Sequence, residues 1–120
     1  MITLKGKVVS GGKVEDSLVG VSDGLITEPG GEVIDLSGHY ILPAFIELHA
    51  HGGGGYDFID NTPESFDSIF STHLSHGVAT LCPTLCACDY GDMLGFLALC
   101  REMKHPGFAG VHLEGPFLSP

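Results

Sequence analysis

Two histidines, His49 and His51, stand two residues apart directly after the apolar run at positions 40–48. Alternate residues of a β-strand point to the same face, so both imidazoles can reach one cation. Two neutral imidazoles held together in a protein interior gain a common partner when a metal ion accepts both lone pairs. We therefore predict that His49 and His51 bind a metal. His112 and Glu114 repeat this spacing near the end of the chain.

Four consecutive glycines, at positions 52–55, follow the second histidine. Glycine has no Cβ, so the backbone here can approach a ligand closely. We expect Gly52 and Gly53 to lie next to substrate, while a flexible loop is the alternative interpretation. The run is not a nucleotide-binding loop, because it lacks the lysine and hydroxyl residue of that motif.

The residues between these groups predict alternating strands and helices. The apolar run at 40–48 indicates a strand buried on both faces, and the segments 78–85 and 108–116 indicate two more strands. Between them we expect a helix over 62–77 and a second over 89–105. Strands and helices in this order form parallel βα units with right-handed crossovers.

Both predicted helices begin at a capping residue and carry an apolar stripe. Thr62 caps the first helix, and Asp89 caps the second. The residues expected to face the core are Phe66, Ile69, Phe70 and Leu74 in the first helix, and Leu94, Leu97 and Cys100 in the second.

Reactive side chains are concentrated at the carboxyl ends of the three predicted strands. The two neighbouring histidines end the first strand, Thr84 lies near the end of the second, and His112 and Glu114 end the third. In a parallel βα barrel the catalytic groups gather at this end of the strands. We therefore expect these side chains to meet at one rim.

Residues 1–42 predict a different kind of structure. Short segments rich in β-branched residues alternate with glycine turns, which indicates a small meander or half-sandwich. A sheet of this size is marginally stable by itself. We predict a partial β-sandwich accessory domain over 1–42 and the first βα units of an incomplete barrel over 43–120.

Composition limits the class of partner. The 120 residues include 43% hydrophobic and 17% charged residues, with a net charge of -10. Such an acidic surface repels nucleic acid and anionic lipid, and no apolar run reaches the roughly 20 residues that span a bilayer. The N-terminus lacks a signal peptide, so we expect a cytoplasmic protein with reduced thiols. The spacing of Cys82, Cys86 and Cys88 lacks the pairing of a structural zinc site, which favours thiols in or near the core.

Three segments together resemble a known enzyme family. LPAFIELHAHGGGGYDFID, HGVATLCPTL and GVHLEGPFLSP are similar to the N-terminal third of N-acetylglucosamine-6-phosphate deacetylases, which are members of the amidohydrolase superfamily. The resemblance implies an α/β fold, in which a small β-sandwich portion precedes about three strands of a (β/α)8 barrel. It also implies hydrolysis of the acetamide of N-acetylglucosamine 6-phosphate to glucosamine 6-phosphate and acetate.

The same resemblance assigns roles to residues. It implies that Glu114 binds the catalytic divalent metal, and that His49 and His51 hold a second ion in members that keep them. Zinc or iron is expected, with one or two ions. Gly115 and Pro116 are expected beside the substrate, and the aspartate that transfers protons is expected beyond Pro120.

The resemblance also implies a homodimer for the full-length protein and an incomplete chain here. Because uncovered strand edges and apolar surfaces invite association, we expect the isolated 120 residues to be inactive and prone to associate. Two alternatives stay open. The protein could be another amidohydrolase, similar to a dihydroorotase, hydantoinase or adenine deaminase, or it could be a noncatalytic truncated remnant.

Overall fold

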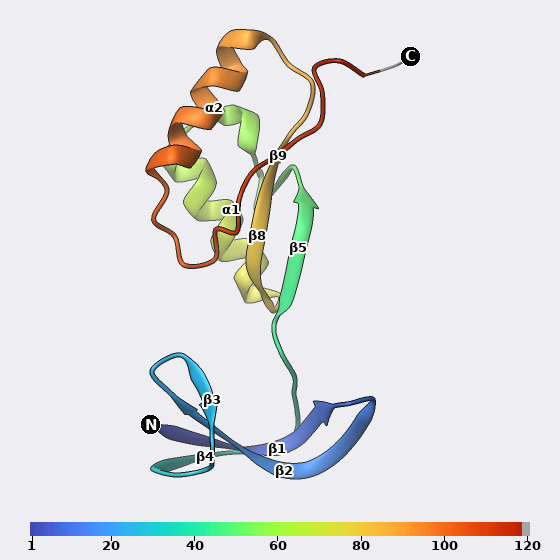
Figure 1. The fold of residues 1–120 in the computed structure, drawn as a ribbon, viewed down its shortest axis with the longest axis vertical. Coiled ribbons are helices and arrows are strands. Elements are labelled where there is room, and N and C mark those ends of the chain that lie inside the picture. The colour runs from blue at the N-terminus through green and yellow to red at the C-terminus, as the bar shows by residue number, and fades with distance from the viewer. Residues whose placement is uncertain (119–120) are drawn as a thin grey trace. The chain divides into compact units, whose positions relative to one another are not determined.

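The computed structural model describes residues 1–118, which divide into two compact units (Figure 1). The first unit spans Met1–Pro43, and the second begins at Ala44. The first contains only strands, and the second alternates strands with helices. The predicted fold class, a small β portion followed by α/β structure, is therefore confirmed.

The first unit is one four-stranded sheet in the order β3-β2-β1-β4. Its strands are β1 (Ile2–Ser10), β2 (Lys13–Ser22), β3 (Leu25–Thr27) and β4 (Glu32–Ile41). The first three strands run antiparallel, as in a meander, but β4 lies parallel to β1. The buried Thr3 hydroxyl donates to the carbonyl of Gly30 and accepts from its N–H, both at 2.7 Å. These two bonds fix the turn that returns the chain beside β1. Of the predicted meander or half-sandwich, the structure has a meander over β1 to β3, to which β4 adds a parallel strand.

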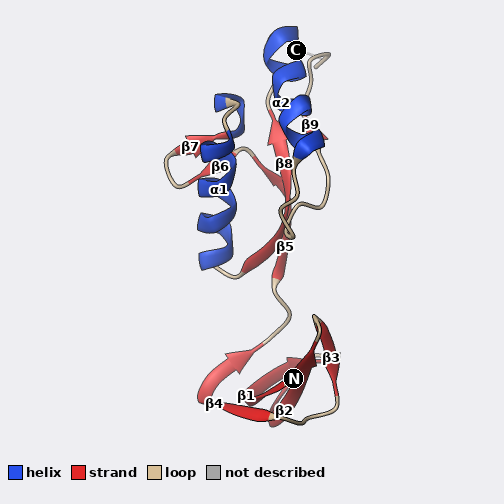
Figure 2. Ribbon diagram, turned by 90° about the vertical axis from the view of Figure 1, so that its left-hand side faces the viewer, coloured by secondary structure: helices blue, strands red, loops and turns tan. Residues whose placement is uncertain are grey.

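The second unit contains a three-stranded parallel sheet in the order β5-β8-β9 (Figure 2). Its strands are β5 (Phe45–Ala50), β8 (Val78–Leu85) and β9 (His112–Leu113), connected by the helices α1 (Pro63–Ser75) and α2 (Tyr90–Glu102). After β5 the chain forms a small hairpin, β6 (Gly52–Gly53) with β7 (Tyr56–Asp57), and then a short 3-10 helix, η1 (Phe58–Asp60). The predicted alternation of strands and helices is present.

The helix starts are those that the sequence predicts. The Thr62 hydroxyl accepts the backbone N–H of Ser65, and the Ser65 hydroxyl oxygen lies 3.4 Å from the Thr62 nitrogen, which together form a capping box. Asp89 accepts the N–H groups of Gly91 and Asp92 at the start of α2. Each cap satisfies donors that have no partner within the helix.

The core of the second unit is built around aromatic rings. Phe58, Phe66 and Phe96 are fully buried, and the ring of Phe66 lies 4.8 Å from that of Phe58 and 5.9 Å from that of Phe96. Leu81 and Leu85 of β8 complete this core from the sheet. The central strand is therefore held from one side by both helices and by η1.

The first predicted strand of the barrel region differs from expectation. The run at 40–48 is divided, because Tyr40 pairs with Lys7 in the first sheet and the chain then leaves that sheet before Pro43. Burial of β5 on both faces was also predicted, and this is wrong for the described residues. Phe45, Ile46 and Leu48 are 59%, 65% and 66% exposed, because β8 is the only described element that packs extensively against β5.

Two further expectations were wrong. Leu74 and Leu94 were placed on the inner helix faces, but both are more than 40% exposed, and the buried positions of α2 are Phe96 and Cys100. The predicted third strand at 108–116 is reduced to His112–Leu113 and one isolated bridge from Leu81 to Phe108. Gly110 adopts a φ of +150°, which interrupts the extended backbone between these two points.

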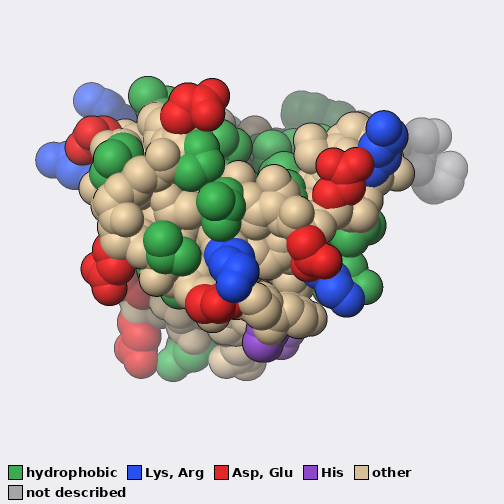
Figure 3. All heavy atoms as spheres, turned by 90° about the horizontal axis from the view of Figure 1, so that it is seen from below, with side chains coloured by type: hydrophobic (Ala, Val, Ile, Leu, Met, Phe, Trp, Pro, Cys, Tyr) green, Lys and Arg blue, Asp and Glu red, His purple; other side chains and the backbone are tan. Residues whose placement is uncertain are grey.

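The face of the molecule that is seen from below carries side chains of mixed character (Figure 3). On the face drawn in Figure 3, hydrophobic side chains are scattered among acidic and basic ones. Among the described residues, neither helix has the length and apolarity required to cross a bilayer.

Candidate metal centre

The carboxyl ends of β5 and β9 bring three polar side chains to one place. His49 belongs to β5, His51 follows it, and Glu114 follows β9. The backbone N–H of Glu114 donates to the carbonyl of Leu85 at 2.9 Å, which extends the ladder between β8 and β9 by one bond. That bond fixes the backbone from which the carboxylate projects.

The ligand atoms of these residues form a compact triangle. Nε2 of His49 lies 3.2 Å from Nε2 of His51, and the Oε2 atom of Glu114 lies 3.0 Å from the former and 3.2 Å from the latter. All candidate ligand atoms of the group lie within 4.8 Å of one another. The expected meeting of these three side chains at one rim is therefore observed.

The spacing of these atoms fits a divalent cation. Zinc bonds of about 2.0–2.1 Å at tetrahedral angles separate adjacent ligand atoms by about 3.3–3.4 Å, a few tenths of an ångström above the observed values. Two imidazole lone pairs and a carboxylate directed at one point repel each other unless a proton or a cation lies between them. The donor set therefore suits a metal ion, and the half-exposed side chains leave the site open to a ligand.

Two neighbouring groups restrain His49. The Glu47 carboxylate accepts the backbone N–H of His49 at 2.9 Å. The imidazole of His112 packs against that of His49, with ring centroids 4.7 Å apart and planes tilted by 48°. His112 was expected at the same rim as Glu114. It lies beside the metal group and is not among the three residues that form it.

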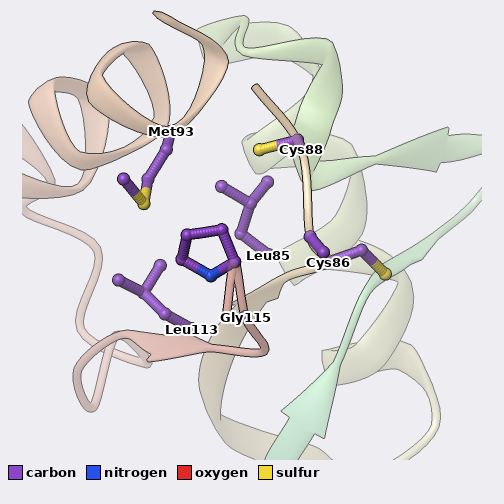
Figure 4. A pocket seen from close by; sticks show the side chains of 8 residues that line it. Leu85, Cys86, Cys88, Met93, Leu113 and Gly115 are labelled. Carbon is purple, nitrogen blue, oxygen red and sulfur yellow. The ribbon is translucent and has the colours of Figure 1, made fainter. Parts of the chain in front are cut away.

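Cys86, which the sequence predicted in or near the core, lies against His51. Cys86 is exposed, and its Sγ atom is 3.1 Å from Nδ1 of His51. Figure 4 shows its sulfur pointing away from the pocket that Leu113 and Met93 line. Burial around the sulfur raises the pKa of this thiol, and the carboxylates of Glu114 and Asp57 raise it further.

The prediction of thiols in or near the core agrees with Cys100, which is buried, and with Cys82 and Cys88, which are partly buried. The exposed Cys86 departs from it. The position of Cys86 in the sequence could have predicted its place near His51. Cys86 directly follows Leu85, the last residue of β8, and β8 lies between β5 and β9, which carry the candidate ligands.

The glycine run has a packing function in the structure. A Cβ on Gly52 would lie 2.2 Å from the carbonyl oxygen of Tyr56, and one on Gly54 would lie 2.4 Å from the Thr72 hydroxyl. Gly54 and Gly55 also have positive φ, as the turn of the hairpin requires. Nε2 of His73 lies 3.1 Å from the carbonyl of Gly52, which anchors the loop to α1.

The other predicted site residues lie on the loop after β9 or in the core. Gly115 has a φ of +108°, its Cβ position is occupied by Ala87, and Pro116 follows it through a cis peptide bond. Thr84 was expected at the rim, but its side chain is buried and its hydroxyl donates to the Cys82 carbonyl. Thr84 therefore supports β8 and stands outside the metal group.

Comparisons with known proteins give a consistent result. No protein-family model matches the chain. It is 29% identical over 124 residues to the N-acetylglucosamine-6-phosphate deacetylase of Bacillus subtilis, a match that covers 89% of this chain and 31% of that protein. It is 27% identical over 117 residues to the N-acetylgalactosamine-6-phosphate deacetylase of Escherichia coli O157:H7, covering 91% of this chain and 31% of that protein.

The fold leads to the same family. A structure of the N-acetyl-D-glucosamine-6-phosphate deacetylase of Mycobacterium smegmatis, in complex with N-acetyl-D-glucosamine-6-phosphate, matches 98% of this chain and 33% of that one, with a TM-score of 0.84 and 25% identity. The chain thus spans about a third of the length of these relatives. The resemblance to these deacetylases that the sequence motifs predict is confirmed.

Proposed function

We propose that this chain, whose sequence and fold are similar to those of the N-terminal third of N-acetylglucosamine-6-phosphate deacetylases, supplies metal ligands to an enzyme that removes acetate from an amino-sugar phosphate. The observation that carries the proposal is the convergence of His49, His51 and Glu114 on one point. In this proposal residues 1–43 form part of an accessory β-sandwich, and the residues from Ala44 onward form the first units of a barrel.

Each residue of the group has a defined task. His49 and His51 offer neutral nitrogen lone pairs, and Glu114 contributes the negative charge that favours a divalent ion. Zinc or iron is the proposed ion, and the single point of convergence supports one ion at this group. When bound, such an ion polarises the acetyl carbonyl and lowers the pKa of a bound water.

The remaining parts of the reaction are proposed to lie outside these 120 residues. They include the aspartate that transfers the proton to the leaving amine, further metal ligands, and the partner subunit of a homodimer. Gly52, Gly53, Gly115 and Pro116 are proposed to lie beside the substrate. They flank the metal group in the sequence, and Gly52 and Gly115 follow His51 and Glu114 directly.

N-acetylgalactosamine 6-phosphate is a second candidate substrate, because one relative is named an N-acetylgalactosamine-6-phosphate deacetylase. The two sugars differ only in the configuration of one hydroxyl group. We therefore propose an N-acetylated hexosamine 6-phosphate as the substrate class, with the glucosamine form as the first candidate.

The test is an assay of the natural gene product that contains these residues. Acetate release is measured from both acetylated sugar phosphates. Ring opening of dihydroorotate and deamination of adenine are measured in parallel, to test the alternative amidohydrolases. Turnover of a sugar phosphate that chelation abolishes and zinc or iron restores is the expected result. Turnover of a cyclic amide or of adenine alone would establish another amidohydrolase. Metal binding without any turnover would indicate a noncatalytic protein.

A further inference from the structure

We infer that Cys86 is a positioning residue for His51, holding this imidazole in the orientation that directs Nε2 at His49 and Glu114. The inference deepens the proposed function and rests on it, because it requires a metal ion at the three-residue group. Its basis is a contact between two elements: Cys86 follows β8, whereas His51 follows β5.

The contact lies on the face of the ring, closer to Nδ1 than to Nε2. Sγ of Cys86 is 3.1 Å from Nδ1 of His51 and 3.9 Å from Nε2. Since the sulfur is within 3.9 Å of both ring nitrogens, it rests against the face of the imidazole, nearer Nδ1. Nε2, in contrast, lies 3.2 Å from the Glu114 carboxylate.

A ring in this position needs a restraint. The torsion about the Cβ–Cγ bond of histidine has broad minima, so a half-exposed imidazole samples many orientations. A sulfur packed on the ring face excludes many of them before a metal binds, which lowers the entropy lost on binding. Nε2 binds a cation only when the ring proton is on Nδ1.

The closing experiment compares zinc affinities of the purified protein by competition with a chromophoric chelator. Groups that orient metal ligands typically contribute 10- to 100-fold to affinity, and a single packing contact places Cys86 at the lower end. We expect Cys86→Ala to weaken zinc binding about tenfold. Cys86→Ser retains a small polar atom at the position and should recover most of the loss.

Cys88→Ala is the matched control. It removes a thiol two residues away that is partly buried, and Figure 4 shows the side chains of Cys86 and Cys88 pointing in different directions. Its zinc affinity should equal that of the wild type. Thermal unfolding of the metal-free proteins should be unchanged by Cys86→Ala, because the exposed thiol contributes to orientation and little to the core.

Three outcomes would overturn the inference. Equal zinc affinity of the wild type and Cys86→Ala would remove the positioning role while leaving the metal site intact. A thiolate-to-cobalt charge-transfer band in the cobalt-loaded wild type would show that the sulfur is itself a ligand. Absence of zinc binding by the wild type would instead contradict the proposed metal function, and the inference with it.

Discussion

Nε2 of His49 lies 3.0 Å from Oε2 of Glu114, although 65 positions separate the two residues in the chain. The contact spans the whole sheet, because β8 lies between the strands that carry the two residues. A parallel sheet explains this relationship: each crossover helix returns the chain so that every strand ends at the same edge. The arrangement of the three candidate ligands is therefore a product of the fold and would be lost with the register of β8.

Removal of the carboxylate should weaken metal binding strongly. Glu114→Gln retains the shape of the side chain but replaces the charged ligand oxygens with an amide. We expect zinc affinity to fall by more than the roughly 10–100-fold that loss of an orienting neighbour costs. Glu102→Gln is the control, since that exposed carboxylate lies beside Arg101 and away from the group. Zinc titration measures the affinity of both variants. An affinity of Glu114→Gln equal to that of the wild type would exclude Glu114 as a ligand.

The aromatic core should dominate the stability of the second unit. Phe66→Ala removes a fully buried ring and should lower the free energy of unfolding by about 3–5 kcal/mol. Phe117→Ala removes a ring that is 98% exposed and should change stability by less than about 0.5 kcal/mol. Urea unfolding followed by circular dichroism compares the two. Similar decreases in the free energy of unfolding for the two variants would mean that Phe66 does not belong to the core.

Local signals predicted the elements of the fold well. Thr62 and Asp89 marked the helix starts, because capping depends on a side chain and the next three residues. The boundaries of β8, Val78–Leu85, were also predicted correctly. The convergence of His49, His51 and Glu114 followed from strand periodicity and parallel topology, with the ligand role of Glu114 supplied by family resemblance.

What the sequence did not predict depends on pairing across the chain. An apolar run does not show that Tyr40 pairs with a strand of the first sheet. Nor does it show whether a second layer covers the side chains of Phe45 and Ile46. Contacts between loops that follow different strands, such as that of Cys86 with His51, leave no periodic pattern at all. The return of β4 beside β1 similarly depends on the bonds between Thr3 and Gly30.

The glycine run should tolerate substitution unequally. Gly54 and Gly55 both have positive φ, so alanine at either position should cost about 1–2 kcal/mol. Gly54→Ala should cost more, because its Cβ also meets the Thr72 hydroxyl, whereas Gly55 faces open space. Adding Thr72→Ala to the Gly54→Ala variant should reduce the difference, and the remainder is expected from the Ser68 hydroxyl, which lies 3.1 Å from the same Cβ position. Chemical denaturation measures these effects, and equal costs would show that the loop does not pack on α1.

Stability of the first unit should depend on pH through Asp35. A hydrogen bond from the Ser37 hydroxyl, a bond from Lys5 and the Ser37 backbone N–H hold the pKa of this carboxyl well below its usual range. A lowered pKa in the folded state stabilises above the usual carboxyl pKa, and the contribution is lost as the pH falls toward the lowered value. The wild type should therefore be more stable than Asp35→Asn at pH 7, and the difference should shrink in acid. Urea midpoints from neutral to acidic pH test this, and a constant difference would contradict it.

The most direct test of the central claim is an anomalous-scattering map from crystals of the zinc-loaded protein, recorded on both sides of the zinc absorption edge. We predict a zinc peak between the imidazoles of His49 and His51 and the carboxylate of Glu114, within about 2.0–2.2 Å of one atom of each. A zinc peak elsewhere in the map, with these three side chains directed away from one another, would contradict the account.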